Sequence, residues 1–271
     1  MKKYVVLILF SFSLGLNAQE LYVFTEPASN IPAKSLGIYG SGKFLKDQHN
    51  DKTTYRTSVG IAYGINKHIM TRISTSFSNM YLTNYRWESI RAYAKYRFLS
   101  LDEVHKHLRA AVFGKLAYSR NVWVYDEVDL DGDQSGWQGG LVVTQLLHKL
   151  AISASGSYNH ILYFEKDKLL RPPVRNVVDY TLSAGYLVFP AEYKNYKQTN
   201  LNIYCELLGQ KALDNNKYAV DIAPALQLIF NSTTKINFGA RFELKSNMHR
   251  MAYPYRSFLV SVDHTILNFA K

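Results

Sequence analysis

Residues 55–65 read YRTSVGIAYGI, and residues 69–78 read IMTRISTSFS. In both stretches a large or β-branched residue alternates with a small or polar one, as Val59 and Ile61 do with Ser58 and Gly60. This period of two is the spacing of a β-strand whose two faces meet different surroundings. A short polar pair, Asn66-Lys67, separates the stretches and is a tight-turn signal. The two stretches are therefore predicted to form a β-hairpin.

The same alternation recurs along almost the whole chain, and few stretches show helical periodicity. We expect about twelve strands, joined by connections that are alternately short and long. The expected strands are residues 35–46, 53–65, 68–79, 85–99, 108–120, 136–147, 150–163, 177–189, 199–208, 217–230, 235–245 and 256–269. Two connections, 100–107 and 190–198, are longer than their neighbours at the short-turn end.

The N-terminus has the three parts of a secretory signal peptide. Lys2 and Lys3 precede an apolar run at residues 5–16, and Ala18 offers a small residue for cleavage. The alternative is a membrane anchor, but the run is shorter than the roughly 20 residues that a spanning helix needs. We expect a signal peptide at 1–18, an N-terminal periplasmic segment at 19–34 and one barrel domain at 35–271.

The segment that follows the expected cleavage point contains Pro27 and Pro32 and is predicted to be neither strand nor helix. A periplasmic tail, a plug in the lumen and a peptide that docks a partner are all open interpretations. A disordered leader is the simplest of them.

The composition excludes several classes of protein. The formal net charge is +11, but the Lys and Arg residues are spread along a secreted chain, so no nucleic-acid partner is expected. Cys205 is the only cysteine, which excludes a disulfide framework, a thiolate metal cluster and a redox pair. No cofactor is expected.

The aromatic residues of the apolar parity collect near the two ends of the expected strands. One group is Tyr55, Phe77, Trp87, Tyr118, Trp137, Tyr158, Tyr180, Tyr218, Phe242 and Phe258; the other is Tyr63, Tyr96, Phe98, Tyr186 and Phe230. Trp and Tyr favour membrane interfaces, so two aromatic rims around an apolar band indicate a membrane barrel. A soluble periplasmic β-sandwich explains the alternation equally well but not the two rims. In hydrocarbon an open sheet edge is not tolerated. The predicted fold is therefore all-β: a closed, antiparallel, up-and-down transmembrane β-barrel of about 12 strands.

On these features the chain resembles the transmembrane β-barrel, porin-like class of outer-membrane proteins, from Ser35 to Phe269. Residues 20–34, ELYVFTEPASNIPAK, are similar to the mature start of a group of functionally uncharacterised outer-membrane barrels. The C-terminus departs from the class, because Ala270 and Lys271 follow the aromatic residue that usually closes the last strand. The resemblance implies a location in the outer membrane of a Gram-negative bacterium and insertion by the outer-membrane assembly machinery.

If the polar parity faces the lumen, the charges there are segregated. The expected basic wall is Lys43, Arg56, Arg72, Arg91, Lys95, Arg97, Arg109 and Lys115, from the first five strands. The expected acidic wall is Asp179, Glu206, Asp221, Glu243 and Asp263, from the last five strands, which also carry Arg241 and Lys245. In a wet pore the field between the two walls would orient polar solutes, and the surplus of bases would favour anions. The alternative is that the charges pair within a plugged barrel, and a barrel of about twelve strands lies between the filled and the open sizes.

Two other groups of residues suggest a metal site or a catalytic site. Asp129, Asp131 and Asp133 match the first three ligand positions of a calcium loop, but Gln134 and Gly140 break the rest of the pattern. An acidic surface loop is the favoured interpretation, with weak metal binding as the alternative. For an outer-membrane enzyme the candidates are Ser157, His160 and Asp179, without a recognisable local signature.

We therefore expect a porin-like channel, not an enzyme, for the passive passage of small polar or anionic solutes. The alternative is a structural or adhesin-like barrel that binds a partner through its outer loops. The expected partners are the lipids and lipopolysaccharide of the outer membrane, the transported solutes and the insertion machinery.

Overall fold

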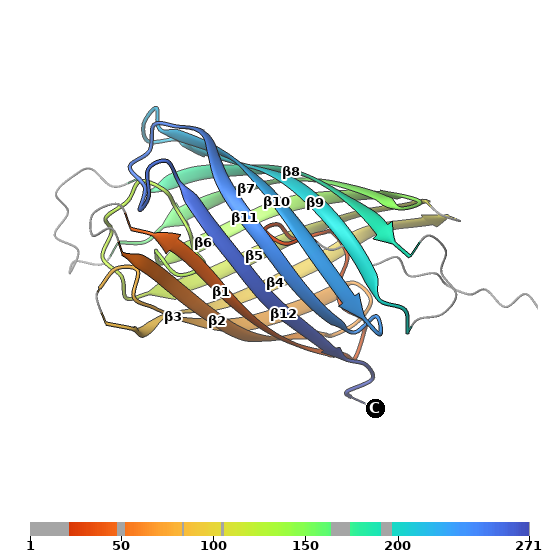
Figure 1. Ribbon diagram of the computed structural model, residues 1–271. Helices are drawn as coiled ribbons and strands as arrows, with labels where there is room; N and C mark the ends of the chain where they lie inside the picture. Colours follow the sequence, from red (N-terminus) through yellow and green to blue (C-terminus); the bar gives the residue numbers. More distant parts are fainter. Residues whose placement is uncertain are drawn as a thin grey trace, which may run out of the picture.

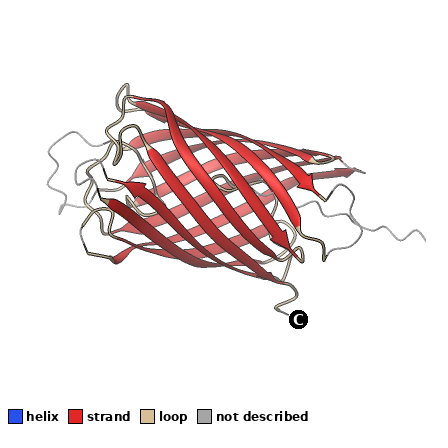
Figure 2. Ribbon diagram, viewed as in Figure 1, coloured by secondary structure: helices blue, strands red, loops and turns tan. Residues whose placement is uncertain are grey.

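The computed structural model describes residues 22–47, 52–82, 84–103, 106–163, 174–190 and 197–270. The chain forms one closed barrel in which each strand pairs antiparallel with its sequence neighbours, and β1 pairs with β12 to close the ring (Figures 1 and 2). The closing ladder runs from Leu36 opposite Ile266 to Leu45 opposite Ser257. The predicted closed, antiparallel, twelve-stranded fold is confirmed. The described part of the chain contains no helix that is long and apolar enough to cross a membrane.

The strands are long, because each must cross the apolar band at a tilt. They are β1 Leu36–Lys46, β2 Thr53–Gly64, β3 Ile69–Ser78, β4 Arg86–Glu103, β5 Lys106–Ser119, β6 Gly136–Leu147, β7 Leu150–Ile161, β8 Asn176–Phe189, β9 Asn200–Ala212, β10 Tyr218–Phe230, β11 Thr234–Ser246 and β12 Arg256–Ile266.

The largest difference from the predicted strands lies at β4 and β5. Residues 100–107 were expected to be a connection, but the β4–β5 ladder continues to Glu103 opposite Lys106. The register shifts between Arg97 and Leu99, which adds one residue to β4. A bulge of this kind interrupts the alternation that the sequence pattern relies on.

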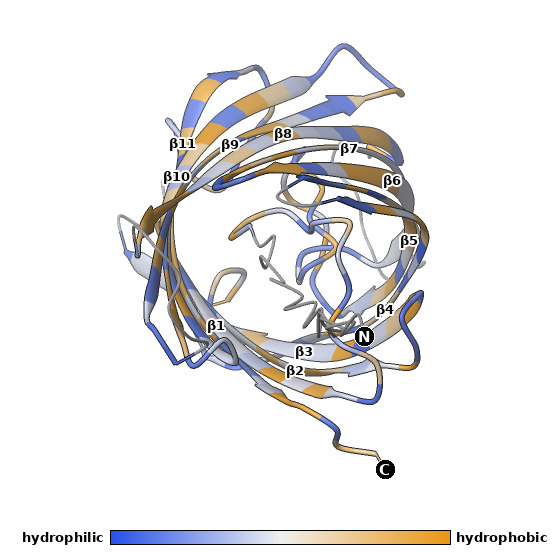
Figure 3. Cartoon of the chain, turned by 90° about the vertical axis from the view of Figure 1, so that its right-hand side faces the viewer, coloured by the Kyte–Doolittle hydropathy of each residue, from blue (hydrophilic) through white to orange (hydrophobic). Residues whose placement is uncertain are grey.

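The alternation of each strand separates an apolar exterior from a polar interior. In β2, Val59 and Ile61 are exposed on the outside, whereas Arg56 and Ser58 are buried on the inside. The same banding of hydrophobic and hydrophilic residues runs along the other strands (Figure 3). Exposed aromatics lie towards both ends of the barrel, including Trp137 and Tyr180 at one end. This is the surface of a barrel that spans a membrane.

The two ends of the barrel differ. At one, which we call the turn end, connections such as the one between Leu147 and Leu150 are short, and the last strand finishes there. At the other, the loop end, the connections are longer, and the longest described one lies between β5 and β6. Described chain segments also lie inside the ring of strands (Figure 3). The predicted signal peptide, residues 1–18, lies outside the described residues.

Candidate functional site

The connection between β5 and β6, residues 120–135, folds into the barrel at the loop end; we call it the inner loop. Its carboxylates meet four cations of the predicted basic wall. Lys43 Nζ lies 3.4 Å from Asp129 Oδ2, Arg56 Nη2 donates to Asp133 Oδ1, Arg91 Nη1 lies 3.7 Å from Asp131 Oδ1, and Lys115 Nζ lies 2.8 Å from Asp131 Oδ1. The most acidic stretch of the sequence therefore lies in the lumen. The sequence pattern had favoured an acidic loop on the outer surface.

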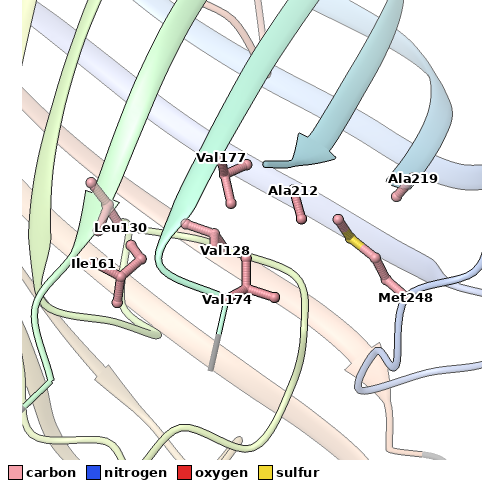
Figure 4. Packing of buried hydrophobic residues seen from close by; sticks show 8 residues of the cluster. All are labelled: Val128, Leu130, Ile161, Val174, Val177, Ala212, Ala219 and Met248. Atoms are coloured by element: carbon pink, nitrogen blue, oxygen red, sulfur yellow. The ribbon is translucent and has the colours of Figure 1, made fainter. Parts of the chain in front are cut away.

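The opposite side of the inner loop is apolar. Val128 and Leu130 are buried against residues of β7, β8, β9 and β10 (Figure 4). The Gln210 side chain completes this contact, since it both accepts from the Val128 N–H and donates to the Val128 carbonyl, each at 2.8 Å. The loop thus spans the lumen, with acidic groups towards the basic wall and apolar groups towards the opposite wall.

Arg250, from the connection between β11 and β12, joins the inner loop to the acidic wall. Its guanidinium donates to Glu127 at 2.8 Å and to Asp221 at 2.7 and 2.8 Å, and it lies 3.2 Å from Glu243 Oε2. The Arg250 side chain is 1% exposed and its guanidinium lies 3.8 Å from the centre of the Tyr255 ring. A buried charge is tolerated only when it is paired and hydrogen-bonded, so Arg250 depends on its carboxylate partners. The cluster thereby holds the inner loop against the connection between β11 and β12.

Glu127 lies in the inner loop, outside the strands that span the membrane. Burial by itself would raise its pKa, but the charges of Arg250 and Arg241 hold the pKa of Glu127 down at about 2. The carboxylate is therefore ionised at neutral pH and pairs with both arginines.

Residues 22–34, which we call the N-terminal segment, fill the lumen nearer the turn end. Arg72 donates to the Glu26 carboxylate, and Lys95 Nζ lies 3.8 Å from the other Glu26 oxygen. Lys95 also donates to the carbonyls of Pro27 at 2.8 Å and Ser29 at 2.7 Å. Of the interpretations that the sequence left open for this segment, these contacts correspond to a plug in the lumen.

The other wall binds the backbone of the same segment. Glu206 accepts hydrogen bonds from the N–H groups of Val23 at 2.9 Å and Phe24 at 3.0 Å. Thr144 Oγ1 accepts from the N–H of Ala28 at 2.9 Å. The N-terminal segment is thus held from both sides of the barrel, as the inner loop is.

The predicted basic wall therefore falls into two tiers. Lys43, Arg56, Arg91 and Lys115 contact the inner loop, and Arg72, Lys95 and Arg109 contact the N-terminal segment, Arg109 through Ser29 Oγ at 2.8 Å. Arg97 donates to the Lys67 carbonyl near the turn end.

The predicted acidic wall is divided in the same manner. Glu206 contacts the N-terminal segment, and Asp221 and Glu243 bind Arg250. Asp179 accepts from Asn159 at 2.7 Å and Gln210 at 2.9 Å, and Asp263 accepts from Asn237 at 3.1 Å. Of the two bases on that side, Arg241 bonds Asp221, and Lys245 is exposed.

Water reaches some of these pairs inside the barrel. The Asp131 side chain is 59% exposed and its partner Lys115 is 19% exposed. The Glu26 side chain is 34% exposed and that of Arg72 is 27% exposed. The lumen is thus constricted by two chain segments, yet its ion pairs remain within reach of small ions.

The two other predicted constellations are not assembled by the fold. Asp129, Asp131 and Asp133 are engaged by wall cations, Asp129 by Lys43 and Arg56, Asp131 by Lys115 and Asp133 by Arg56, and the described residues contain no group of metal-ligating side chains. Metal binding there stays a prediction. Ser157 and Asp179 are paired across β7 and β8, but His160 packs against Trp137 on the outer face.

Sequence reasoning missed Glu88, which is fully buried in β4 and accepts from Arg56 at 2.6 and 2.9 Å. The first five strands were expected to supply no acid to the lumen. A bulge explains the omission, since the β3–β4 register shifts so that Phe77 pairs with Trp87 and Ser76 with Ser89. Glu88 and Ser89 are consequently both buried, which a strict alternation excludes. Arg250 and Glu26 were missed because they lie outside the strands.

The sequence matches no described protein family and no curated protein. Solved structures do match the fold. A NanC porin is 13% identical, with a TM-score of 0.50 over 84% of this chain and 98% of the porin. An outer membrane channel from Pseudomonas putida F1 is also 13% identical, with a TM-score of 0.54 over 90% of this chain and 100% of the channel. At this identity the likeness concerns the fold. The chain therefore has the fold of the outer-membrane β-barrel channels.

Proposed function

We propose that this protein is an outer-membrane channel for the passive passage of small anionic solutes, and that the inner loop and the N-terminal segment hold it in a closed or narrow state. One observation carries the proposal. Seven lumen cations contact carboxylates, carbonyls or a hydroxyl of two segments that take no part in the barrel wall, although Arg56 and Arg109 also pair with the wall carboxylates Glu88 and Asp102. When such a segment leaves, the cations that it covered become available to anions in the lumen.

Several features support movement of the segments within an intact wall. The β-ladders close without either segment, so a segment that moves breaks no strand pairing of the wall. The Lys115–Asp131 pair is accessible to water and is therefore weakened by salt, unlike a fully buried pair. The Arg72–Glu26 pair has the same property. An anionic solute entering the lumen competes with these carboxylates for the same cations.

The test is the conductance of the purified, folded chain in a planar bilayer with a salt gradient across it. We expect discrete steps with a reversal potential that indicates anion preference. Arg72→Ser combined with Arg91→Ser should reduce that preference, since it removes one cation from each tier. Arg256→Ser is the matched control, because Arg256 is exposed at the start of β12. A folded, inserted barrel that never conducts would overturn the proposal.

A barrel that binds a partner through its outer loops is the second candidate. Exposed apolar side chains in two connections at the loop end favour it: Val122, 49% exposed, and Val124, 44% exposed, lie among the first residues of the inner loop, and Tyr253, 71% exposed, lies between β11 and β12. Large exposed apolar groups on loops are typical of interaction surfaces. Contacts with lipopolysaccharide at these loops, and recognition by the insertion machinery, stay predictions.

A further inference from the structure

We propose that Arg72 and Lys95, together with the rings of Tyr39 and Tyr93, form a binding site for the carboxylate of a small organic solute, and that Glu26 of the same chain occupies this site in the structure. The inference rests on the proposed channel function and gives it a solute class and a position in the lumen.

The site is built on three strands of one side of the wall, β1, β3 and β4, with β2 between β1 and β3. Arg72 of β3 lies opposite Tyr93 of β4, and its guanidinium lies 5.3 Å from the centre of that ring. On its other flank the Tyr39 ring of β1 lies 5.1 Å away. Cation–π contacts on two sides fix the guanidinium in place, so that its remaining donors are directed at a ligand. Lys95, two residues beyond Tyr93 and 2% exposed, supplies the second positive charge.

Glu26 has the position of a ligand and not of a wall residue. It belongs to the N-terminal segment. One oxygen of its carboxylate accepts a hydrogen bond from Arg72, and Lys95 Nζ lies 3.8 Å from the other oxygen. Its side chain and that of Arg72 both keep access to water, as exchange with a solute requires. A carboxylate from solution is therefore chemically equivalent to the group already bound.

Donor atoms remain at the site beyond those that Glu26 engages. The hydroxyl of Tyr93 and Nε of Arg72 are buried, and neither has a hydrogen-bond partner among the described residues. A buried polar atom without a partner costs free energy, and one at a ligand site is often satisfied by the ligand. A free solute, unlike a side chain tethered to the segment, is able to adjust its position to reach both donors.

The surroundings favour an organic carboxylate over an inorganic anion. Phe113 stacks against Tyr93 with ring centres 6.0 Å apart, so an apolar surface continues from the cationic centre along the wall. Tyr39 has room beside Arg72 because position 60 is glycine: a Cβ there would lie 2.5 Å from the Tyr39 ring. Aromatic surface next to a fixed guanidinium suits a carboxylate with a hydrocarbon body.

The tether makes Glu26 a strong competitor. A short flexible linker places its end at an effective concentration of roughly millimolar, so a solute must overcome this competition in the wild-type chain. Glu26→Gln removes the competing charge but keeps an oxygen that accepts from Arg72. It also leaves the Lys95 contacts with Pro27 and Ser29, so the segment itself stays anchored.

The test is isothermal titration of the full-length chain, folded in detergent, with N-acetyl-L-glutamate α-amide. We expect Glu26→Gln to bind this probe at least tenfold more tightly than the wild-type chain. The neutral analogue N-acetyl-L-glutamine amide should bind neither. Equal affinity of the wild-type chain and Glu26→Gln for the acidic probe would refute the site.

Three further variants, each made together with Glu26→Gln, locate the binding. Adding Arg72→Gln should weaken it at least tenfold. Adding Arg256→Gln, which removes an exposed positive charge at the loop end, should leave it unchanged. Adding Tyr93→Phe deletes one hydroxyl and no packing, and should weaken binding several-fold in a barrel that folds normally. Undiminished binding in both the Arg72 and the Tyr93 variants would place the probe elsewhere and overturn the inference.

A parallel titration with propionate separates two sources of the carboxylate. Equal affinity for both probes indicates simple organic acids, whereas stronger binding of the blocked glutamate indicates acidic peptides, whose amide groups make contacts beyond the carboxylate. Binding in detergent does not require conduction. A silent bilayer with Glu26-dependent binding would reject the channel and keep the site, and conduction without such binding would do the reverse.

Discussion

The wall and the two segments inside it are held by different kinds of interaction. Each wall strand is bonded to its neighbours through backbone ladders, the longest of which joins β4 to β5 from Ser89 opposite Ser119 to Glu103 opposite Lys106. The inner loop and the N-terminal segment are instead held mainly by side chains, such as Lys115 on Asp131 and Arg72 on Glu26. Backbone ladders are shielded in hydrocarbon, whereas these ion pairs have access to water and respond to salt.

From this difference we infer that two properties are separable: the pairing of the strands into a barrel, and the obstruction of its lumen by the two segments. A substitution in the wall should change the free energy of unfolding with little effect on the segments. A substitution at the contacts of a segment should release that segment and leave the barrel folded. Four predictions, from the largest expected effect to the smallest, test this separation.

The largest effect is expected from Arg250→Ala. The change leaves Glu127, Asp221 and Glu243 without the buried guanidinium that they share. Removing one partner of a buried ion cluster typically costs about 3–5 kcal/mol. Most of that cost should appear as release of the inner loop, measured as faster hydrogen exchange of its amides and more frequent conducting events.

Arg256→Ala is the control for the Arg250 variant, because it removes an exposed arginine close by at the start of β12. It should change neither exchange nor conductance. The contrary result would be inner-loop amides of Arg250→Ala that exchange only when the whole barrel unfolds. That result would mean that the wall and the inner loop unfold as one cooperative unit, and that they are not separable.

The second prediction concerns a substitution in the barrel wall, away from both segments. Val59→Arg places a charge on the outer face of β2, where Val59 is 45% exposed in the apolar band. An arginine near the bilayer midplane costs about 2–4 kcal/mol, and one near the interface about 0–1 kcal/mol. Thr53→Arg, at the start of the same strand, is the matched control. Urea titration in lipid vesicles should show the loss for Val59→Arg, with inner-loop exchange in the folded state unchanged.

The sequence predicted the wall well, because period two is a local property of each strand. β6 was predicted with the bounds that it has, Gly136–Leu147. Prediction failed where the period is interrupted, as at Glu88, whose bulge turns one extra residue inward. The basic wall was also found from parity, but its partners were not. Glu26 and Glu127 reach their cations from distant parts of the chain, and no local pattern encodes such pairing.

Acid should release the inner loop through Glu127. Its pKa is about 2 when paired, below its ordinary value of 4.5. A lowered pKa stabilises the paired state above about pH 4.5, and this stabilisation, about 3 kcal/mol, is lost as the pH falls towards 2. Conductance should therefore be steady from pH 7 to about 5 and rise below it.

Glu127→Gln isolates this carboxylate from Asp221 and Glu243, which share the same arginine. Because the amide does not titrate, the variant should conduct more often at pH 7 and respond less to acid than the wild-type chain. An acid response of the same size in both proteins would assign the effect to another carboxylate.

The smallest effect is expected at Gly132, and it tests the loop without changing a charge. Gly132 has a φ of 155°, and a Cβ there would lie 2.5 Å from the Arg56 guanidinium and 2.8 Å from Glu88. Gly132→Ala should therefore strain the inner loop by about 1–3 kcal/mol and shift it away from Arg56. Gly156→Ala is the matched control, because a Cβ at Gly156 meets no atom within 4 Å. Bilayer recordings should show more conducting events for Gly132→Ala alone, with the urea midpoints of both variants unchanged. A lowered midpoint for Gly132→Ala without more conduction would mean that the loop supports the wall instead of closing the lumen.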